Sequence, residues 1–192
     1  MTSDVPLIGL SGYARSGKDT VASVLADHGF RRVGFADSLR EVALALDPTI
    51  EASSHARSAR LSTLISVYGW EYSKDAWPDV RRVLQRLGTE VGRKFFGDNV
   101  WVDLALAKVT GPTVFTDCRF PNEAAAIRSR GGEVWRVKRP GFGPVNAHPS
   151  ETGLDDYAFS CVILNDSTLD DLAAQVRLAA TTYGAVDGRI AG

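Results

Sequence analysis

The chain has 192 residues, which on a soft prior of about 150 residues per domain describes one domain with room for an insertion. Hydrophobic residues make up 44% and charged residues 23%, which excludes a disordered or collagen-like chain. The formal net charge is −1, whereas a general nucleic-acid binder is more often clearly basic, so we expect no polynucleotide partner.

No apolar run approaches the roughly 20 residues that span a bilayer, so we expect no membrane span. The first residues lack a basic segment followed by a long apolar one, so we expect no signal peptide. Cys118 and Cys161 form neither a CxxC motif nor a Cys/His cluster, which argues against a disulfide framework and a zinc site. These features together predict a protein of a reducing cytoplasm.

The N-terminal part alternates short apolar segments with helical patterns. Gly12 follows the first apolar segment and suits a turn, and Gly29 suits the position just after a helix. Asp37 or Ser38 is a candidate cap of the next helix. The expected elements here are a strand at 5–11, a helix at 18–28, a strand at 31–36 and a helix at 39–46.

Residues 47–78 are harder to interpret, and we expect a loop followed by a short helix near 61–68. A helix is predicted over 79–95, because apolar residues recur there at helical spacing. Gly88 and Gly92 lie inside this pattern, where each costs about 1 kcal/mol relative to alanine. They suggest close approach by another backbone or by a ligand. The apolar stripe consists of Val80, Val83, Leu84, Leu87 and Val91.

Strands and helices continue to alternate toward the C-terminus. That order predicts an α/β fold of three layers, with a mostly parallel sheet of about five strands and helices on both faces. Ligands of such sheets lie at the carboxyl ends of the strands. The expected elements are strands at 112–117, 133–138 and 160–164, helices at 121–130 and from Ser167 or Thr168 to Tyr183, and a Pro/Gly-rich loop at 139–150.

The segment from Gly12 to Lys18 matches the phosphate-binding pattern GxxxxGK between a predicted strand and a predicted helix. Gly12 and Gly17 permit backbone angles that other residues avoid. The N–H groups of the loop, that of Ser16 included, are then able to converge on phosphate oxygens at the helix N-terminus. Lys18 supplies a positive charge for the β- and γ-phosphates, so the pattern predicts an ATP site.

Asp19 stands where this pattern normally has a Ser or Thr that touches Mg²⁺, and Thr20 comes next. We expect Asp19 to bind Mg²⁺ directly or through water, since this ion prefers hard oxygen ligands; the alternative is a charge that favours the helix dipole. Thr20 offers its hydroxyl or N–H to the α-phosphate. Arg15, inside the loop, is expected to bridge the γ-phosphate and the acceptor, or else to be a solvated arginine.

The sequence lacks the NKxD and DxxG motifs of a GTPase switch and is short for a motor ATPase. A small kinase remains, whose chemistry is phosphate positioning and charge neutralisation. A phosphate acceptor needs no strong general base, because its second pKa is about 6.

The sequence resembles the deoxynucleoside monophosphate kinases of bacteriophages, within the nucleoside monophosphate kinase group. The resemblance spans most of the chain and implies transfer of the ATP γ-phosphoryl group to a deoxynucleoside 5′-monophosphate. The blocks that carry the resemblance are GYARSGKDT (12–20), FADSLR (35–40), LQRLGTEVGR (84–93), NVWV (99–102), TDCRFPNEA (116–124), HPSE (148–151) and ILNDSTLDDL (163–172). The unusual GKDT in the first of these blocks is typical of that family.

The resemblance places several polar residues at the acceptor nucleotide. Arg40 is the natural phosphate clamp, because guanidinium pairs with phosphate in a bidentate way. On the predicted helix 79–95, three polar residues follow at intervals of four and form a stripe, which the resemblance places at the acceptor base and sugar; a solvated face gives the same pattern. Aromatic residues are candidates for stacking on the base or for the core. The acceptor candidates are Asp37, Ser38 and Arg40, the stripe Gln85, Thr89 and Arg93, and the aromatics Tyr68, Trp70 and Trp101.

Asp117 ends an apolar strand and resembles a Walker B carboxylate that holds Mg²⁺ through water, and Arg119 is placed to clamp phosphate. Structural salt bridges are the alternative for both. The loop 139–150 resembles a lid whose arginine would neutralise the transferring phosphoryl group. By the same resemblance Glu151 contacts substrate or an arginine, and Asn165 lies next to the ATP adenine. The candidate lid arginines are Arg128, Arg130, Arg136 and Arg139.

We therefore expect one P-loop kinase domain, with a core at 1–37 and 111–192 and an acceptor-binding insertion at about 38–110. Its substrates would be Mg-ATP and a deoxynucleoside monophosphate. The oligomeric state stays open, a homodimer included. The alternatives are another small-molecule P-loop kinase, such as one resembling dephospho-coenzyme A kinase, and a non-catalytic nucleotide-binding switch.

Overall fold

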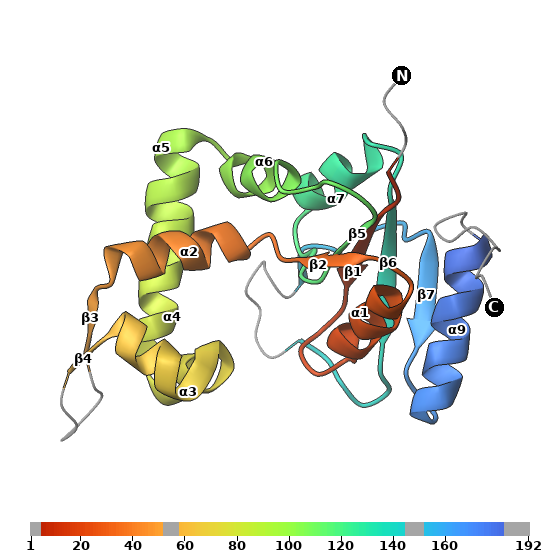
Figure 1. Cartoon of the computed structure of the whole chain (residues 1–192), viewed down its shortest axis with the longest axis horizontal. Coiled ribbons are helices and arrows are strands. Elements are labelled where there is room, and N and C mark those ends of the chain that lie inside the picture. The colour runs from red at the N-terminus through yellow and green to blue at the C-terminus, as the bar shows by residue number, and fades with distance from the viewer. Residues whose placement is uncertain (1–4, 52–57, 145–151, 183–192) are drawn as a thin grey trace. The chain divides into compact units, whose positions relative to one another are not determined.

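The computed structural model describes residues 5–51, 58–144 and 152–182. It divides into two compact units (Figure 1). Unit 1 comprises Met1–Phe35 with Ala105–Gly192, and unit 2 comprises Ala36–Leu104. No helix within the described ranges is long and apolar enough to cross a membrane.

Unit 1 is built on a parallel five-stranded sheet in the order β2-β5-β1-β6-β7. All carboxyl ends of a parallel sheet share one edge, so the loops that follow these strands gather there. Central β1 is buried at every residue, as a strand covered on both faces must be. The strands are β1 (Leu7–Ser11), β2 (Arg31–Val33), β5 (Thr113–Phe115), β6 (Glu133–Lys138) and β7 (Cys161–Leu164).

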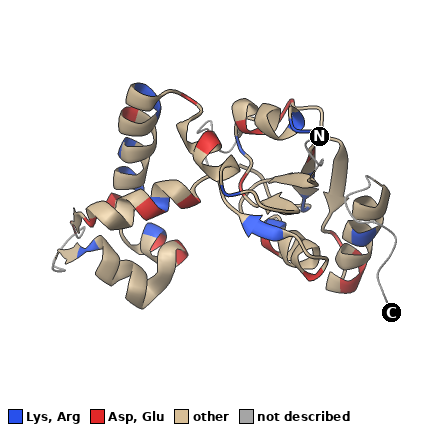
Figure 2. Ribbon diagram, turned by 45° about the horizontal axis from the view of Figure 1, so that its top comes forward, with Lys and Arg blue, Asp and Glu red and all other residues tan. Residues whose placement is uncertain are grey.

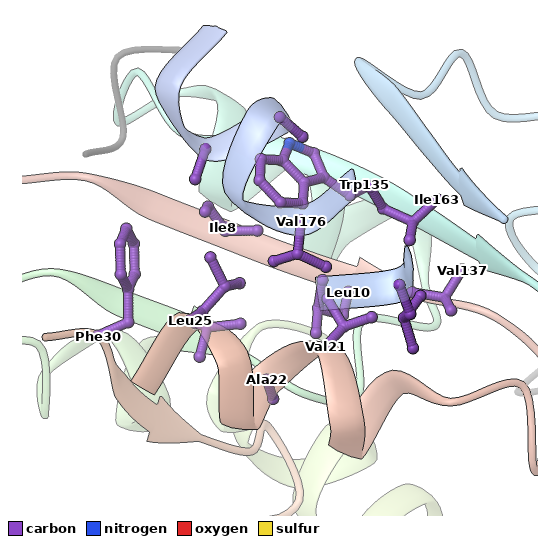
Figure 3. Packing of buried hydrophobic residues seen from close by; sticks show 14 residues of the cluster. Ile8, Leu10, Val21, Ala22, Leu25, Phe30, Trp135, Val137, Ile163 and Val176 are labelled. Carbon is purple, nitrogen blue, oxygen red and sulfur yellow. The ribbon is translucent and has the colours of Figure 1, made fainter. Parts of the chain in front are cut away.

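Helices cover both faces of this sheet. On one face, α1 (Lys18–Asp27) packs against α9 (Leu169–Thr182) over a core that includes Ile8, Trp135 and Val176 (Figure 3). The opposite face is covered by α7 (Pro121–Arg128), which contacts β1 and β6. The predicted three-layer α/β fold is confirmed.

Two helices of unit 1 begin with side-chain hydrogen bonds to the backbone of their first turn. At the start of α7, the buried carboxylate of Glu123 accepts hydrogen bonds from the N–H groups of Arg119 (2.7 Å) and Phe120 (3.0 Å), and Pro121 occupies the first turn. Before α9, Thr168 and Asp171 exchange hydrogen bonds, as in a capping box.

Unit 2 is mainly helical. A small antiparallel pair, β3 (Thr49–Ile50) and β4 (Ala59–Arg60), precedes its longest helix. Its core contains Ile50, Leu61 and Val80. The helical elements are α2 (Asp37–Leu46), α3 (Leu61–Ala76), α4 (Pro78–Gln85), a π-helical segment (Arg86–Arg93), α5 (Lys94–Phe96) and α6 (Val100–Leu106), the last of which continues into unit 1.

The structure corrects the predicted helix over 79–95 in its second half. From Arg86 the helix is π-helical, with hydrogen bonds that span one more residue per turn. Each such turn shifts the register of the side chains. Val80, Val83, Leu84 and Leu87 pack in the core, but Val91 is 43% exposed.

Other expectations for unit 2 were also incomplete. The helix that begins at Leu61 runs to Ala76 rather than to residue 68, with a break at Gly69, whose φ is 73°. Helix α6 was not predicted. The residue before α2 is Ala36, so neither Asp37 nor Ser38 caps that helix. In unit 1 the predicted strands 31–36 and 112–117 shorten to β2 and β5.

Candidate active site

The loop between β1 and α1, residues 12–17, has a backbone that only glycine allows at two points. Gly12 has φ 153°, and a Cβ there would lie 2.4 Å from the carbonyl oxygen of Val137. Gly17, directly before α1, has φ 103°. Arg15 also takes a left-handed φ of 63°. Left-handed residues that alternate with right-handed ones form concave backbones suited to anions.

Two polar side chains lie at this loop, those of Ser16 and of Lys18, the first residue of α1. The hydroxyl of Ser16 is buried and finds no hydrogen-bond partner within the part of the chain that the structure describes. A buried polar atom without a partner is costly, so an oxygen-rich ligand at this loop would relieve it. The ammonium of Lys18 donates to the carbonyl oxygens of Gly12 (2.7 Å) and Tyr13 (2.8 Å), so it is held against the loop. This is the geometry of a phosphate-binding loop.

Asn165, which follows β7, forms a hydrogen bond to the same loop. Its side-chain N–H donates to the carbonyl oxygen of Ser16 at 3.0 Å, and its main-chain N–H donates to Lys138 at 2.8 Å. A Cβ at Gly17 would lie 2.4 Å from its amide nitrogen. The residue expected next to the adenine therefore also shapes the loop.

The two candidate metal ligands differ in their surroundings. The carboxylate of Asp19 is 90% exposed and forms an ion pair with Arg32 at 2.9 Å. Asp117 accepts a hydrogen bond from the N–H of Phe35 at 2.7 Å, which joins the chain after β5 to the chain after β2. Among the described residues no group of three or more His, Cys, Asp or Glu side chains is arranged to hold a metal. Mg²⁺ fits this arrangement, because it keeps several waters and binds through one or two carboxylates and substrate phosphates.

Residues beside Asp117 are held by burial and by backbone contacts. Cys118 is buried, and its main-chain N–H donates to Leu10. Burial, followed by the charges of Glu123 and Asp117, raises the pKa of the Cys118 thiol well above its ordinary value. The thiol stays neutral and is no nucleophile. Arg119, next in the chain, is exposed.

The four candidate lid arginines have separate environments. Arg139 reaches the P-loop, where it approaches the carbonyl oxygen of Arg15 at 3.5 Å, and its guanidinium lies over Phe142 at 4.8 Å. Arg136 is instead buried, paired with Asp155 at 2.9 Å. The other two bond to nearby chain: Arg128 pairs with Glu133, and Arg130 approaches the carbonyl oxygen of Ala126. Glu151 and residues 145–150 of the loop lie outside the described residues.

A cavity of about 590 Å³ adjoins the P-loop within unit 1. Its volume falls in the range of small-molecule sites, about 300–1,000 Å³. Its walls come from the P-loop (Tyr13 and Ser16), the chain from Arg136 to Phe142, the segment that carries Asp155, Tyr157 and Phe159, and β7 (Val162 and Leu164). Sequence reasoning did not single out Tyr13, Asp155 and Phe159, because no sequence pattern assigns a function to these three positions.

In unit 2, the stripe expected at the acceptor lies on one continuous helix. Gln85 and Thr89 are exposed and Arg93 is half-buried. Basic residues recur along this helix (Figure 2), although Arg81, Arg82 and Arg86 are ion-paired with neighbouring carboxylates.

The candidate clamp Arg40 also belongs to a local network. It lies 3.6 Å from Asp37 and 3.8 Å from Glu71, and its guanidinium is 5.7 Å from the centre of the Trp70 ring. Ser38 is buried in the first turn of α2.

The aromatic candidates of unit 2 divide into exposed and packed rings. Tyr68 is 49% exposed; it stacks on Tyr72, with ring centres 5.4 Å apart, and lies against the tilted ring of Trp77, with ring centres 5.2 Å apart. Trp101 is buried, and its indole N–H donates to Gly88 at 2.9 Å. A Cβ at Gly92 would lie 2.4 Å from the Trp101 ring. Trp101 therefore packs in the core, which is one of the two roles that the sequence left open for it, and its ring accounts for the glycine at 92.

A five-stranded parallel sheet with a glycine-rich loop and lysine after its central strand defines a P-loop phosphotransferase. A family model described as deoxynucleotide monophosphate kinase matches residues 51–176, and the chain belongs to that family. The resemblance noted in the sequence is thus confirmed.

Two viral proteins are similar to this chain. One is a protein of Acanthamoeba polyphaga mimivirus, provisionally named as a deoxynucleotide monophosphate kinase, which is 30% identical over 88% of this chain and 93% of its own length. The deoxynucleotide monophosphate kinase of Enterobacteria phage T4 is 32% identical over 54% of this chain, but the match covers only 46% of that protein. Among solved structures, a dephospho-CoA kinase from Campylobacter jejuni aligns over 92% of this chain and 96% of its own, with 13% identity and a TM-score of 0.47.

Proposed function

We propose that this chain transfers the γ-phosphoryl group of ATP to the phosphate of a deoxynucleoside monophosphate, which gives a deoxynucleoside diphosphate and ADP. The observation that carries the proposal is the P-loop with Lys18 against it, in a chain of the deoxynucleotide monophosphate kinase family. Such transfer depends on positioning and on charge neutralisation more than on covalent chemistry of the protein.

The donor site belongs to unit 1. The N–H groups of residues 12–17 and the N-terminus of α1, where Thr20 lies, bind the phosphates of ATP, and the Ser16 hydroxyl gains the partner that it lacks. Lys18 leaves the loop carbonyls and neutralises the β- and γ-phosphates. The adjoining cavity takes the rest of the donor nucleotide, with Asn165 at its border with the loop.

Mg²⁺ accompanies the ATP, and Asp19 and Asp117 hold it, directly or through water. When bound, the ion would neutralise charge on the phosphate oxygens of ATP. The ion pair of Asp19 with Arg32 is exposed, and exposed pairs contribute only about 0–1 kcal/mol, so the carboxylate remains available to the ion.

In unit 1, the negative charge of the phosphates is neutralised by Arg15, Arg119 and Arg139. Arg139 is the lid arginine of this proposal, because it is the one that reaches a P-loop carbonyl. An arginine at the transferring group stabilises the charge that spreads over its oxygens in the transition state. The acceptor phosphate needs no strong base, since its second pKa is about 6.

Unit 2 supplies the groups that recognise the acceptor nucleoside. Arg40, near Asp37, binds the phosphate; Gln85, Thr89 and Arg93 read the base and sugar; and Tyr68 and Trp70 offer ring faces. A glutamine amide both donates and accepts hydrogen bonds, as base recognition requires. This assigns the insertion of about 38–110, which overlaps most of unit 2 (Ala36–Leu104), to acceptor specificity. The reaction belongs in the cytoplasm, where both nucleotides occur.

A panel of acceptors tests the proposal. The purified chain is incubated with Mg-ATP and, in separate reactions, each deoxynucleoside monophosphate, each ribonucleoside monophosphate or dephospho-coenzyme A, and ADP release is followed in a coupled assay. We expect release that depends on at least one deoxynucleoside monophosphate. Release with dephospho-coenzyme A alone would support the other kinase class, and ATP binding without acceptor-dependent release would support a nucleotide-binding switch.

A further inference from the structure

Three polar side chains from distant parts of the chain meet beside the P-loop. The phenol O–H of Tyr13 donates to Oδ1 of Asp155 at 2.8 Å. The guanidinium of Arg136 donates to the same oxygen at 2.9 Å. One carboxylate oxygen thus holds a P-loop side chain and a side chain of β6 together.

Several side chains among the described residues hold Arg136 in place. Its side chain is only 6% exposed. Its guanidinium carbon lies 4.5 Å from the centre of the Tyr13 ring and 5.5 Å from that of the Phe159 ring, and Nη1 donates to the hydroxyl of Ser11 at 3.3 Å. A buried guanidinium needs a charged partner, and Asp155 supplies it.

The contacts of Asp155 lead to the lysine of the phosphate site. The side chain of Tyr13 bonds to Asp155, while its main-chain carbonyl oxygen accepts hydrogen bonds from the Lys18 ammonium at 2.8 Å and from the N–H of Ser16 at 3.2 Å. A shift of the Tyr13 ring therefore moves the carbonyl at which Lys18 and Ser16 are held. Burial and the hydrogen bond to Asp155 raise the pKa of Tyr13, so its phenol stays a protonated donor at neutral pH.

We propose that Asp155 is a positioning residue for phosphoryl transfer, which acts through Tyr13 and Arg136 to fix the first half of the P-loop in the conformation that binds the triphosphate. The inference rests on the proposed function and adds to it a residue that the glycine-rich motif does not contain. Positioning matters because a misplacement of about 1 Å can reduce a rate by about 100-fold.

The test compares Asp155→Asn and Tyr13→Phe with the wild type. Tyr13→Phe removes only the hydroxyl and keeps the ring over Arg136, so it spares the packing. Asp156→Asn is the matched control, because it makes the same change at an exposed neighbour. The readouts are kcat, KM for ATP, KM for the acceptor, and the midpoint of thermal unfolding.

For both test variants we expect kcat/KM for ATP to fall about tenfold, with KM for the acceptor within about twofold of the wild type. The control should match the wild type. The double variant should lose little more than the more affected single variant, because both changes weaken the same Tyr13–Asp155 contact. A fall in the unfolding midpoint with unchanged kinetic constants for the folded protein would mean a purely structural role and would overturn the inference, as would unchanged kinetics in Tyr13→Phe.

A direct measurement of ATP affinity separates this inference from the proposed function. If the wild type binds ATP but phosphorylates no deoxynucleoside monophosphate, the proposed function fails. The positioning role then still predicts weaker ATP binding in Tyr13→Phe and Asp155→Asn than in Asp156→Asn. Equal ATP affinity in all three variants would reject it.

Discussion

The two units hold their polar side chains in different ways. In unit 1, the groups at the carboxyl edge of the sheet bond to the backbone: Lys18 to two loop carbonyls, Asp117 to the N–H of Phe35, and Asn165 to Ser16. In unit 2, the polar residues of the helix from Pro78 to Phe96 are largely exposed, and several of them form ion pairs with neighbouring side chains.

This difference separates two tasks. Asp117 and Asn165 are bonded to the backbone before the substrate arrives and need little rearrangement, whereas Lys18 has only to turn from the loop carbonyls to the phosphates. This preorganisation suits the phosphate chemistry that is common to all turnovers. Exposed side chains on a helix can be substituted with little loss of stability. Such positions are therefore suited to selecting among acceptors. Substitutions in unit 1 should therefore act on the rate, and those in unit 2 on acceptor choice or on stability.

The largest expected effect is on the rate, from Lys18→Ala in unit 1. We expect kcat to fall by about 10³-fold or more, because one preorganised charge-stabilising donor is worth about 10²–10³ and Lys18 carries a full charge. Circular dichroism and the unfolding midpoint should stay near those of the wild type. Lys94→Ala, at an exposed lysine of α5, is the control. A rate near that of the wild type in Lys18→Ala would contradict the phosphate role.

Packing in unit 2 gives the next largest effect. Gly92→Ala places a Cβ 2.4 Å from the Trp101 ring, and overpacking of this kind costs about 1–3 kcal/mol. Urea unfolding should detect the loss of stability. Gly111→Ala is the control, because a Cβ there meets nothing within 4 Å. Equal stability of the two variants would show that Trp101 and Gly92 are not in tight contact.

Acceptor choice is tested by Gln85→Ala. We expect KM for the preferred acceptor to rise about tenfold, or the order of preference among bases to change, because the loss of a hydrogen bond to substrate is worth about 1–1.5 kcal/mol. KM for ATP should not change. Glu90→Ala, which removes an exposed side chain from the same helix, should leave both constants as they are. Unchanged kinetics for every deoxynucleoside monophosphate would refute base recognition by Gln85.

The smallest effect concerns acid stability of unit 2. A hydrogen bond from the N–H of Ser62 (2.8 Å), assisted by Arg60 (3.0 Å), lowers the pKa of Asp47. Because the folded state has the lower pKa, the stabilisation is present above the unfolded value of about 4 and is lost as the pH falls through the folded value.

Unfolding of Asp47→Asn and the wild type should therefore differ near pH 6 and converge below about pH 4. Asp103→Asn, at an exposed carboxylate of α6, serves as the control. A difference between Asp47→Asn and the wild type that stays constant across this range would show that the charge of Asp47 is not the stabilising element.

The parts of the fold that the sequence predicted well are those whose cause is local. The P-loop was predicted from two glycines and a lysine at fixed spacing. The parallel sheet was predicted from the alternation of apolar and helical segments along the chain. The bounds of β6 were predicted as found, at Glu133–Lys138, because its residues alternate in character and Gly131 and Gly132 separate them from the preceding helix.

The parts that were missed depend on contacts between distant residues. The π-helical segment leaves no mark in the periodicity, so Val91 was placed in the core although it is exposed. Tyr13 and Asp155 are 142 residues apart; Tyr13 occupies a variable position of the GxxxxGK pattern, and Asp155 lies in no motif, so nothing in the sequence joins them. The role of Trp101 stayed open between stacking and packing, because an aromatic residue near candidate substrate groups looks the same in sequence in either role.

The central claim is that the γ-phosphoryl group moves from ATP to a second nucleotide rather than to water. Phosphorus-31 NMR of the purified chain with Mg-ATP and a deoxynucleoside monophosphate follows this transfer directly. The account predicts that the γ-phosphorus signal of ATP declines at the rate at which the two signals of a deoxynucleoside diphosphate appear. Growth of inorganic phosphate in their place, or a γ-phosphorus signal that persists with every acceptor, would contradict it.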